Sequence, residues 1–270
     1  MQHAVAAPKD QLVITTEVEL LEFIYRFFYS IYEEIRFRLY YGPVFHRFLN
    51  RKFRYYHQLP AKSKLRFLRL VRDHFEYFKF EARGGLRLTR GRKAIISAAA
   101  SQLAMHLPSE SFTFYTRIFV YPDHYESLHT GKLHKGEVNP GFRLIVFSWR
   151  AVEEGLNPGD DGVNLLLHEF GHALWLEHKL MHHEYTVLDE ALVARFEALA
   201  ALEMEKLVTN QEHFFRRYAF ANIEEFFAVA VENFFERPTR FRQEIPEIYD
   251  TLVRLFGQNP PDPASTGKRR

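Results

Sequence analysis

The sequence contains no cysteine. Disulfides and a thiolate zinc site are therefore excluded, and a bound metal ion would need His, Asp or Glu as ligands. The sequence also lacks an uninterrupted apolar run, because the stretch 12–31 is broken by Glu17, Glu19, Glu22 and Arg26. No basic region followed by a cleavage site precedes this stretch. We expect a soluble, cytoplasmic protein.

Acidic residues are scarce in the N-terminal third. Between Arg36 and Arg92 there are only three, Asp73, Glu76 and Glu81. Within this region, residues 47–56 interleave basic and aromatic side chains, a pattern found at contacts with nucleic acid or an anionic membrane surface. It is also typical of amphipathic helices with a solvated basic face, and we favour this interpretation because no nucleic-acid-binding motif accompanies the charge.

The chain length of 270 residues suits one domain with its own core and a smaller helical attachment. We predict an N-terminal helical extension over 1–42, a main domain over 43–257 and a flexible tail over 258–270. The extension has apolar residues at helical spacing and needs a partner for that face. These residues are Leu20, Phe23, Ile24, Phe27, Phe28, Ile31 and Ile35.

The main domain is predicted to be α+β. Residues 86–88 are a short strand candidate. Segments rich in β-branched and aromatic residues predict strands at 112–121 and 142–149, which we expect to pair antiparallel. Helical patterns predict a helix that begins near residue 60, a buried helix of small residues at 95–107, and four helices further on. Those four cover residues 163–179, 187–208, 222–235 and 246–256.

One five-residue string carries chemistry: His168-Glu169-Phe170-Gly171-His172. On a helix, residues four apart share one face, so both histidines can hold one zinc ion, and Glu169 can reach a water molecule on that ion. Zinc lowers the pKa of such a water and polarises a carbonyl, while the carboxylate moves the proton, which is the chemistry of a metallopeptidase. Asp160 or Asp161 is a candidate cap for this helix.

A catalytic zinc ion needs a third protein ligand, and the residues offer two candidates. His178 has metzincin spacing, but Trp175 stands where that pattern needs a glycine turn. Glu225 lies on a later predicted helix and would complete a His, His, Glu site. Asn222, three residues earlier, gives Glu225 an alternative role in a capping box. Both alternatives stay open on the residues alone.

Several further segments resemble one family in the order in which they occur. They are Leu59-Pro60-Ala61, Gly84-Gly85-Leu86, Val120-Tyr121-Pro122, Val146-Phe147-Ser148-Trp149, residues 164–172, Tyr218-Ala219, residues 225–229 and residues 232–235. Over about residues 60–260 the chain resembles the MtfA-like zinc peptidases, which are similar to the catalytic domain of anthrax lethal factor. The resemblance implies a zincin-like fold and a bound Zn²⁺ ion.

The resemblance also implies roles for individual residues. His168, His172 and Glu225 would be the zinc ligands, Glu169 the general base, and Tyr218 a donor to the oxyanion. Glu232, two turns after Glu225, would orient a histidine ligand or simply be a solvated glutamate. The sequence departs from the family just after His172, where Trp175 is followed by the histidines His178, His182 and His183.

The resemblance further implies a substrate class and an alternative. Family members suggest aminopeptidase activity or narrow endopeptidase activity on peptide or protein substrates, with the substrate added as a strand beside the segment that ends at Trp149. The alternative function is a regulatory protein that sequesters a transcriptional repressor with little catalysis. The N-terminal helix lies outside the resemblance and is a candidate for contact with a membrane surface.

Overall fold

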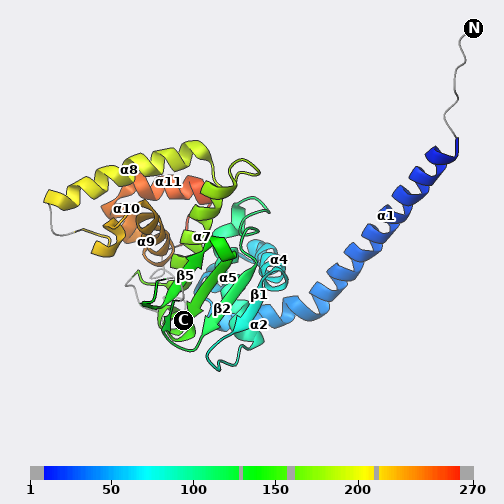
Figure 1. Cartoon of the computed structure of the whole chain (residues 1–270), viewed down its shortest axis with the longest axis horizontal. Coiled ribbons are helices and arrows are strands. Elements are labelled where there is room, and N and C mark those ends of the chain that lie inside the picture. Colours follow the sequence, from blue (N-terminus) through cyan, green and yellow to red (C-terminus); the bar gives the residue numbers. More distant parts are fainter. Residues whose placement is uncertain (1–8, 128–129, 157–161, 210–212, 262–270) are drawn as a thin grey trace, which may run out of the picture. The chain divides into compact units, whose positions relative to one another are not determined.

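The computed structural model describes residues 9–127, 130–156, 162–209 and 213–261 (Figure 1). Contacts between residues divide the chain into two units, Met1–His46 and Arg47–Arg270. The candidate chemistry lies entirely in the second unit.

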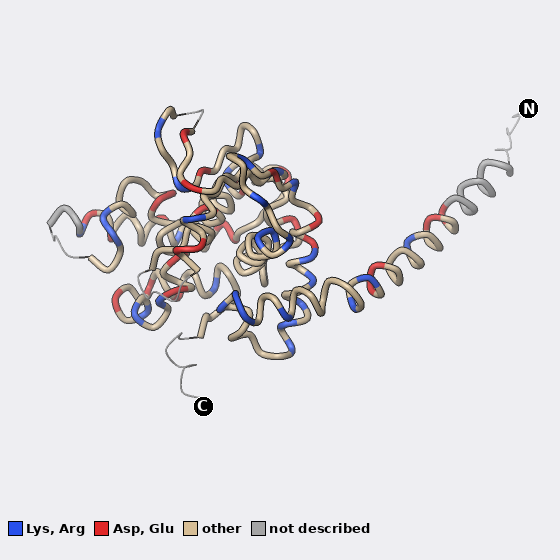
Figure 2. Tube along the Cα trace, turned by 90° about the horizontal axis from the view of Figure 1, so that it is seen from below, with Lys and Arg blue, Asp and Glu red and all other residues tan. Residues whose placement is uncertain are grey.

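The first unit is helical. Helix α1 (Lys9–Arg36) runs into a π-helical turn (Phe37–Tyr41), and α2 (Gly42–Lys52) begins at once, so the helical segment continues past residue 42, the predicted end of the extension, and into the second unit. The apolar side chains predicted for one face of α1 are exposed, among them Phe23, Phe28 and Ile35. Acidic and basic positions alternate along α1 in Figure 2. Within the described residues, no helix is both long and apolar enough to span a membrane.

The second unit consists mainly of helices. They are α3 (Arg54–Gln58), α4 (Ala61–Tyr77), α5 (Arg90–Leu103), α6 (Trp149–Leu156), α7 (Leu165–Met181), α8 (Glu190–Thr209), α9 (Ile223–Glu236), α10 (Pro238–Glu244) and α11 (Pro246–Phe256). Three short 3-10 turns cover Ala104–His106, Pro140–Phe142 and Arg217–Phe220. The run of small residues in α5 is fully buried, as its composition predicts, and packs against α4 and α7.

A four-stranded mixed sheet supports these helices, with the order β1-β2-β6-β5. Its strands are β1 (Lys79–Ala82), β2 (Arg117–Tyr121), β5 (Gly136–Asn139) and β6 (Leu144–Ser148), and β3 (Tyr125–Glu126) pairs separately with β4 (Leu133–His134). Strands β1, β2 and β6 are parallel, whereas β5 is antiparallel to β6 and forms one edge. Helix α7 packs on β5 and β6, beside α9 and α5 (Figure 1).

The architecture is α+β, as predicted, and its sheet is small and mixed, but three details differ. Residues 86–88 form no strand, and the first strand is β1 instead. Strands β2 and β6 pair parallel, not antiparallel. Strand β6, which ends before Trp149, lies inside the sheet between β2 and β5, so the exposed edge that the sequence assigned to it belongs to β5.

The C-terminal segment packs further along the chain than the predicted boundary at residue 257. The side chain of Gln258 is buried, donates a hydrogen bond to the carbonyl of Gln102 and accepts one from the hydroxyl of Tyr55. The hydroxyl of Tyr249 donates to Asn259. The remainder of the predicted tail, from residue 262, lies outside the described residues.

Candidate metal centre

Helix α7 begins at a capped and buried position. The N-cap is Asn164, whose side-chain oxygen accepts a hydrogen bond from the backbone N–H of Leu167. Such a bond satisfies one of the free donors at a helix start. The predicted capping residues, Asp160 and Asp161, lie outside the described residues. The cap fixes the first turn of the helix that carries His168 and His172.

Three potential ligand atoms converge beside α7. The Nε2 atoms of His168 and His172 are 3.2 Å apart, and Oε2 of Glu225 lies 3.4 Å from the first and 3.3 Å from the second. Within the described part of the chain, these three residues are the group of histidine and carboxylate side chains that could hold a metal ion. The sequence-predicted set therefore meets in space.

Glu225 occupies the first turn of α9 and is held there by its backbone. Its N–H donates to the side chain of Asn222 at 2.8 Å, which is the cap that the sequence suggested. Its carboxylate does not serve the cap: Oε1 accepts a hydrogen bond from the Tyr218 hydroxyl at 2.7 Å, and Oε2 faces the two histidines. Helix capping and an inward carboxylate are therefore compatible at this residue.

Close packing of α7 on α9 brings the carboxylate to the histidines. A Cβ placed on Gly171 would lie 3.2 Å from the Cα of Ala228, so the two helices cross with almost no side chain between them. A contact that short leaves little room for a larger residue. The glycine inside the motif thus has a packing role.

Glu232 supports one of the histidines. Its side chain is completely buried, and Oε1 lies 2.6 Å from Nδ1 of His168. The backbone N–H of Asn164 donates to Oε2 at 2.8 Å, and Arg216 donates to both oxygens at 2.6 and 3.1 Å. Glu232 is thus no solvated glutamate: burial and four polar contacts fix its carboxylate against the ring.

The charges of this group shift its protonation equilibria. Burial lowers the pKa of His168, but the adjacent carboxylates of Glu225 and Glu232 outweigh it and raise that pKa to about 10. For Glu225, burial raises the pKa, but the two histidines hold it well below its usual range. The carboxylate of Glu225 is therefore the charged, electron-donating form that a cation requires.

Glu169 lies in the wall of a cavity of about 460 Å³, with His168, Tyr218 and Gly136. The carboxyl group is buried, which raises its pKa above the ordinary value. A Cβ on Gly136 would overlap that carboxyl group, so strand β5 can pass over Glu169 only as glycine. The cavity places the proposed base next to the two histidines and the edge strand.

Tyr218 lies on the rim of the same cavity, and its side chain is more than half exposed. Its hydroxyl donates to Glu225, and its ring centroid lies 6.2 Å from that of His168. Burial of the hydroxyl and the adjacent carboxylate raise its pKa, so it is a neutral donor at ordinary pH.

The competing ligand, His178, is not part of this group. Helix α7 continues unbroken to Met181, and six residues of helix turn a side chain by about 240° away from His172. Trp175 lies in that helix, fully buried against Phe227 and Phe196 at centroid distances of 4.8 and 6.1 Å. The residue that disagrees with the metzincin pattern is a core anchor, and His178 is buried on another side of the helix.

The three ligand atoms fit a zinc ion. Zinc bonds to nitrogen and oxygen of about 2.0–2.1 Å in a tetrahedron imply ligand separations of about 3.3–3.4 Å, which the observed 3.2, 3.3 and 3.4 Å match. Oε2 of Glu225 is buried and has no hydrogen-bond donor among the described residues, so a cation would satisfy it. Two imidazoles and one carboxylate also suit zinc chemically.

A site with two histidines one turn apart, a glutamate from a second helix and a buried glutamate beside the first histidine has the composition of a mononuclear metallohydrolase centre. Residues 41–257 match the family model of the glucose-regulated metallopeptidases M90, so the chain belongs to that family. It therefore also belongs to the MtfA-like peptidases that the sequence resembles.

A curated relative extends the comparison without adding a function. The uncharacterized protein slr2042 of Synechocystis sp. is 22% identical over 233 residues, which cover 81% of this chain and 85% of that protein.

Some residues of the site had no role in the sequence analysis. Arg216 and Gly136 have no spacing to the motif that would reveal their contacts, and Gly171, although it lies inside the motif, acts through a contact with Ala228 on a distant helix. Asn164 lies in a segment that resembles the family. An asparagine near the start of a predicted helix is the sequence signal of its capping bond with Leu167.

Proposed function

We propose that this chain is a zinc-dependent metallopeptidase with a zincin-like fold, in which His168, His172 and Glu225 bind Zn²⁺ and Glu169 is the general base. The observation that carries the proposal is the triangle of three ligand atoms with tetrahedral edge lengths. Its peptide bond cleavage would be of the aminopeptidase or narrow endopeptidase type.

The residues around the site have separate tasks. Nδ1–H of His168 donates to Glu232, and the proton that the raised pKa keeps on Nε2 would leave when a metal ion binds, which frees the Nε2 lone pair as a ligand. When bound, zinc supplies Lewis acidity toward the carbonyl and lowers the pKa of water. Glu169 takes the proton from the attacking water and delivers it to the leaving amine. Tyr218 turns its hydroxyl from Glu225 toward the oxyanion.

Strand β5 is the proposed docking edge for substrate. It lies at the end of the sheet order, and Gly136 at its start borders the catalytic cavity. An extended peptide could add to this edge through main-chain hydrogen bonds. The carbonyl to be cleaved would then lie near Glu169.

Metal analysis and a peptide panel test the proposal together. We expect about one zinc per chain in the purified protein, lost on His168→Ala. Glu169→Gln should keep the zinc and abolish hydrolysis, because the base is removed while the ligands stay. Peptides with free and with acetylated N-termini separate aminopeptidase from endopeptidase cleavage. A wild-type protein that binds no zinc would refute the proposal.

The regulatory alternative predicts a different result. If the chain sequesters a transcriptional repressor without catalysis, Glu169→Gln should leave its biological effect unchanged. The complete set of ligands, base and supporting carboxylate favours the enzyme, because a binding surface has no need of a buried base.

A further inference from the structure

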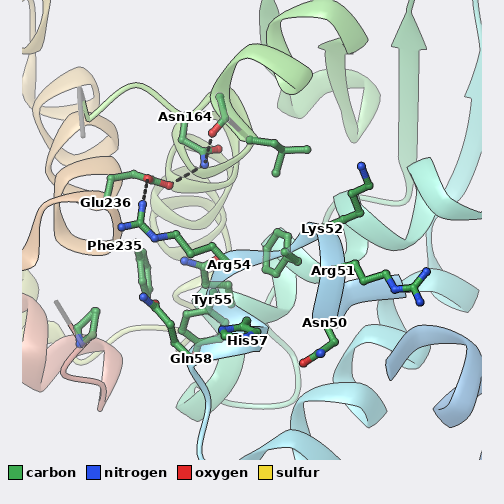
Figure 3. Close-up of a pocket in the computed structure, with 15 residues that line it drawn as sticks. Asn50, Arg51, Lys52, Arg54, Tyr55, His57, Gln58, Asn164, Phe235 and Glu236 are labelled. Atoms are coloured by element: carbon green, nitrogen blue, oxygen red, sulfur yellow. Dashed lines mark hydrogen bonds and ion pairs between the residues drawn. The ribbon is translucent and has the colours of Figure 1, made fainter. Parts of the chain in front are cut away.

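A second cavity, of about 380 Å³, lies among α2, α3, the end of α9 and the start of α7 (Figure 3). Its wall includes much of the basic and aromatic segment noted in the sequence, now placed beside the candidate metal centre. The proposed catalytic steps use none of these basic residues. The cavity thus needs an explanation of its own.

The wall carries an excess of positive charge. Arg51, Lys52 and Arg54 line it, opposed by the single acid Glu236. Figure 3 shows Arg54 directed toward Glu236, at 3.9 Å, whereas Arg51 and Lys52 lie on the other side of the cavity. Both of these side chains are exposed, and neither has an ion-pair partner within the described part of the chain. Two uncompensated cations therefore remain for an anionic ligand.

The aromatic rings of the wall are already packed against other rings. Tyr55 contacts Phe235 edge-on at 5.9 Å and Phe67 at 5.4 Å, and Phe53 stacks on Phe67 at 6.3 Å. Nucleobases bind such grooves by stacking on free ring faces. Because the rings of the wall are already packed against other rings, the cavity favours an anion recognised by charge over a nucleic acid recognised by stacking.

Gly155 joins this cavity to the catalytic one. It lines both. A Cβ on Gly155 would lie 3.1 Å from the Cα of Asn164 and 3.3 Å from the carbonyl oxygen of Val163, so the backbone of these two residues packs directly against Gly155. Asn164 also donates from its side chain to the carbonyl of Gly155 at 3.3 Å. A ligand that fills one cavity therefore reaches the border of the other.

We propose that the basic cavity is an exosite for an acidic segment of the polypeptide substrate. The carboxylates of that segment would pair with Arg51 and Lys52, while the bond to be cleaved lies in the catalytic cavity beyond Gly155. The inference rests on the proposed peptidase function for its substrate, but the binding itself requires no catalysis. Its electrostatic part weakens as ionic strength rises.

Binding can be measured without cleavage in the full-length Glu169→Gln variant. The probe is a fluorescent peptide rich in glutamate, followed by anisotropy, with a lysine-rich peptide of equal length beside it. We expect only the acidic peptide to bind. Adding Arg51→Glu and Lys52→Glu should raise its Kd about tenfold or more, because two attractions become repulsions.

The matched control carries the same charge change elsewhere. Lys62→Glu with Arg87→Glu alters two exposed basic residues outside the cavity and should change the Kd less than about twofold. In the active enzyme, the cavity variant should raise KM for substrates with an acidic extension and leave kcat unchanged.

Two results would overturn the exosite. One is an equal effect of both double variants on the Kd, which would mean non-specific charge attraction. The other is tighter binding of a single-stranded oligonucleotide than of the acidic peptide at the same sites. If the acidic peptide binds as expected but the wild-type protein cleaves no peptide, the exosite stands as a binding site and the peptidase proposal fails.

Discussion

Glu232 is not one of the proposed metal ligands, but it contacts one of them directly. It touches Nδ1 of His168, so it sets which ring nitrogen carries the proton. Glu232→Gln keeps the shape but replaces a charged acceptor with a neutral amide. We expect zinc affinity to fall about 10- to 100-fold, as for other partners of metal-bound histidines. Competition with a fluorescent chelator measures it.

Glu244→Gln is the control for this change, because Glu244 lies on α10 and its ion-pair partner is Arg240, at 3.7 Å, not a residue of the metal centre. It should leave zinc affinity unaltered. Equal zinc affinity in Glu232→Gln and wild type would show that the buried carboxylate has no influence on the metal.

Gly136 gives a second prediction at the residue scale. A methyl group there would overlap the Glu169 carboxyl group, so Gly136→Ala should displace the base and lower kcat by about tenfold or more. Zinc content should stay near one per chain, because no ligand moves. In the control Gly141→Ala, the new methyl would meet only the Asn139 side chain at 3.5 Å, an ordinary contact. Steady-state kinetics on one peptide compares the two, and unchanged kcat in Gly136→Ala would contradict the expectation.

At the scale of elements, the crossing of α7 and α9 controls the site. Gly171→Val would push the helices apart at the Cα of Ala228, which carries Glu225 away from the histidines. Overpacking of this kind costs about 1–3 kcal/mol of unfolding free energy. We expect a lower melting temperature together with weaker zinc binding. A variant that loses stability but binds zinc as tightly as wild type would show that the crossing does not set the ligand geometry.

Elements also differ in how well a sequence predicts them. The pattern around His168 and Glu225 predicted both helices, because helical spacing is local. The pairing of 112–121 with 142–149 was predicted with the wrong direction. Strand β5, which lies between these segments in sequence, runs antiparallel to β6, and this reversal of the chain makes β2 and β6 parallel. Strand β1 escaped notice because it has only four residues, Lys79–Ala82, of which two are charged and none is β-branched.

The residues of the candidate site also differ in how well the sequence predicts them. Residue types and local spacing indicated the ligands and the base, and the family resemblance supported Glu225. Arg216 contacts residues that are 16 and 48 positions away, and Gly136 on strand β5 contacts Glu169 on helix α7. Only the folded chain reveals these contacts. Trp175 seemed a departure near the site, but it lies in the core, where a change of residue type has no direct chemical meaning.

At the scale of the whole molecule, a buried histidine far from the metal centre links stability to pH. His74 lies 2.8 Å from Ser101 Oγ and stacks on Phe78, and burial lowers its pKa from 6.5 to about 4. Between pH 6.5 and about pH 4 the unfolded chain therefore binds a proton at His74 that the folded chain does not bind. The stability that His74 contributes is full above pH 6.5 and is lost as the pH drops toward 4, by up to about 3 kcal/mol.

Urea unfolding at pH 7 and pH 5 tests this linkage. His74→Gln has no proton to take up, so its loss of stability between the two pH values should be smaller than that of the wild type. The same pH dependence in both proteins would assign the acid sensitivity to other groups.

The cap of α7 has a consequence for which sequences the fold can accept. By capping preference alone, Asp would replace Asn164 without loss. Here the amide nitrogen of Asn164 donates to Glu236 at 2.9 Å while its backbone N–H donates to Glu232. An aspartate would set a third carboxylate against these two, so a substitution that is neutral at most helix starts is expected to destabilise the protein at this one. The residue that caps α7 is therefore restricted by the buried carboxylate that supports His168.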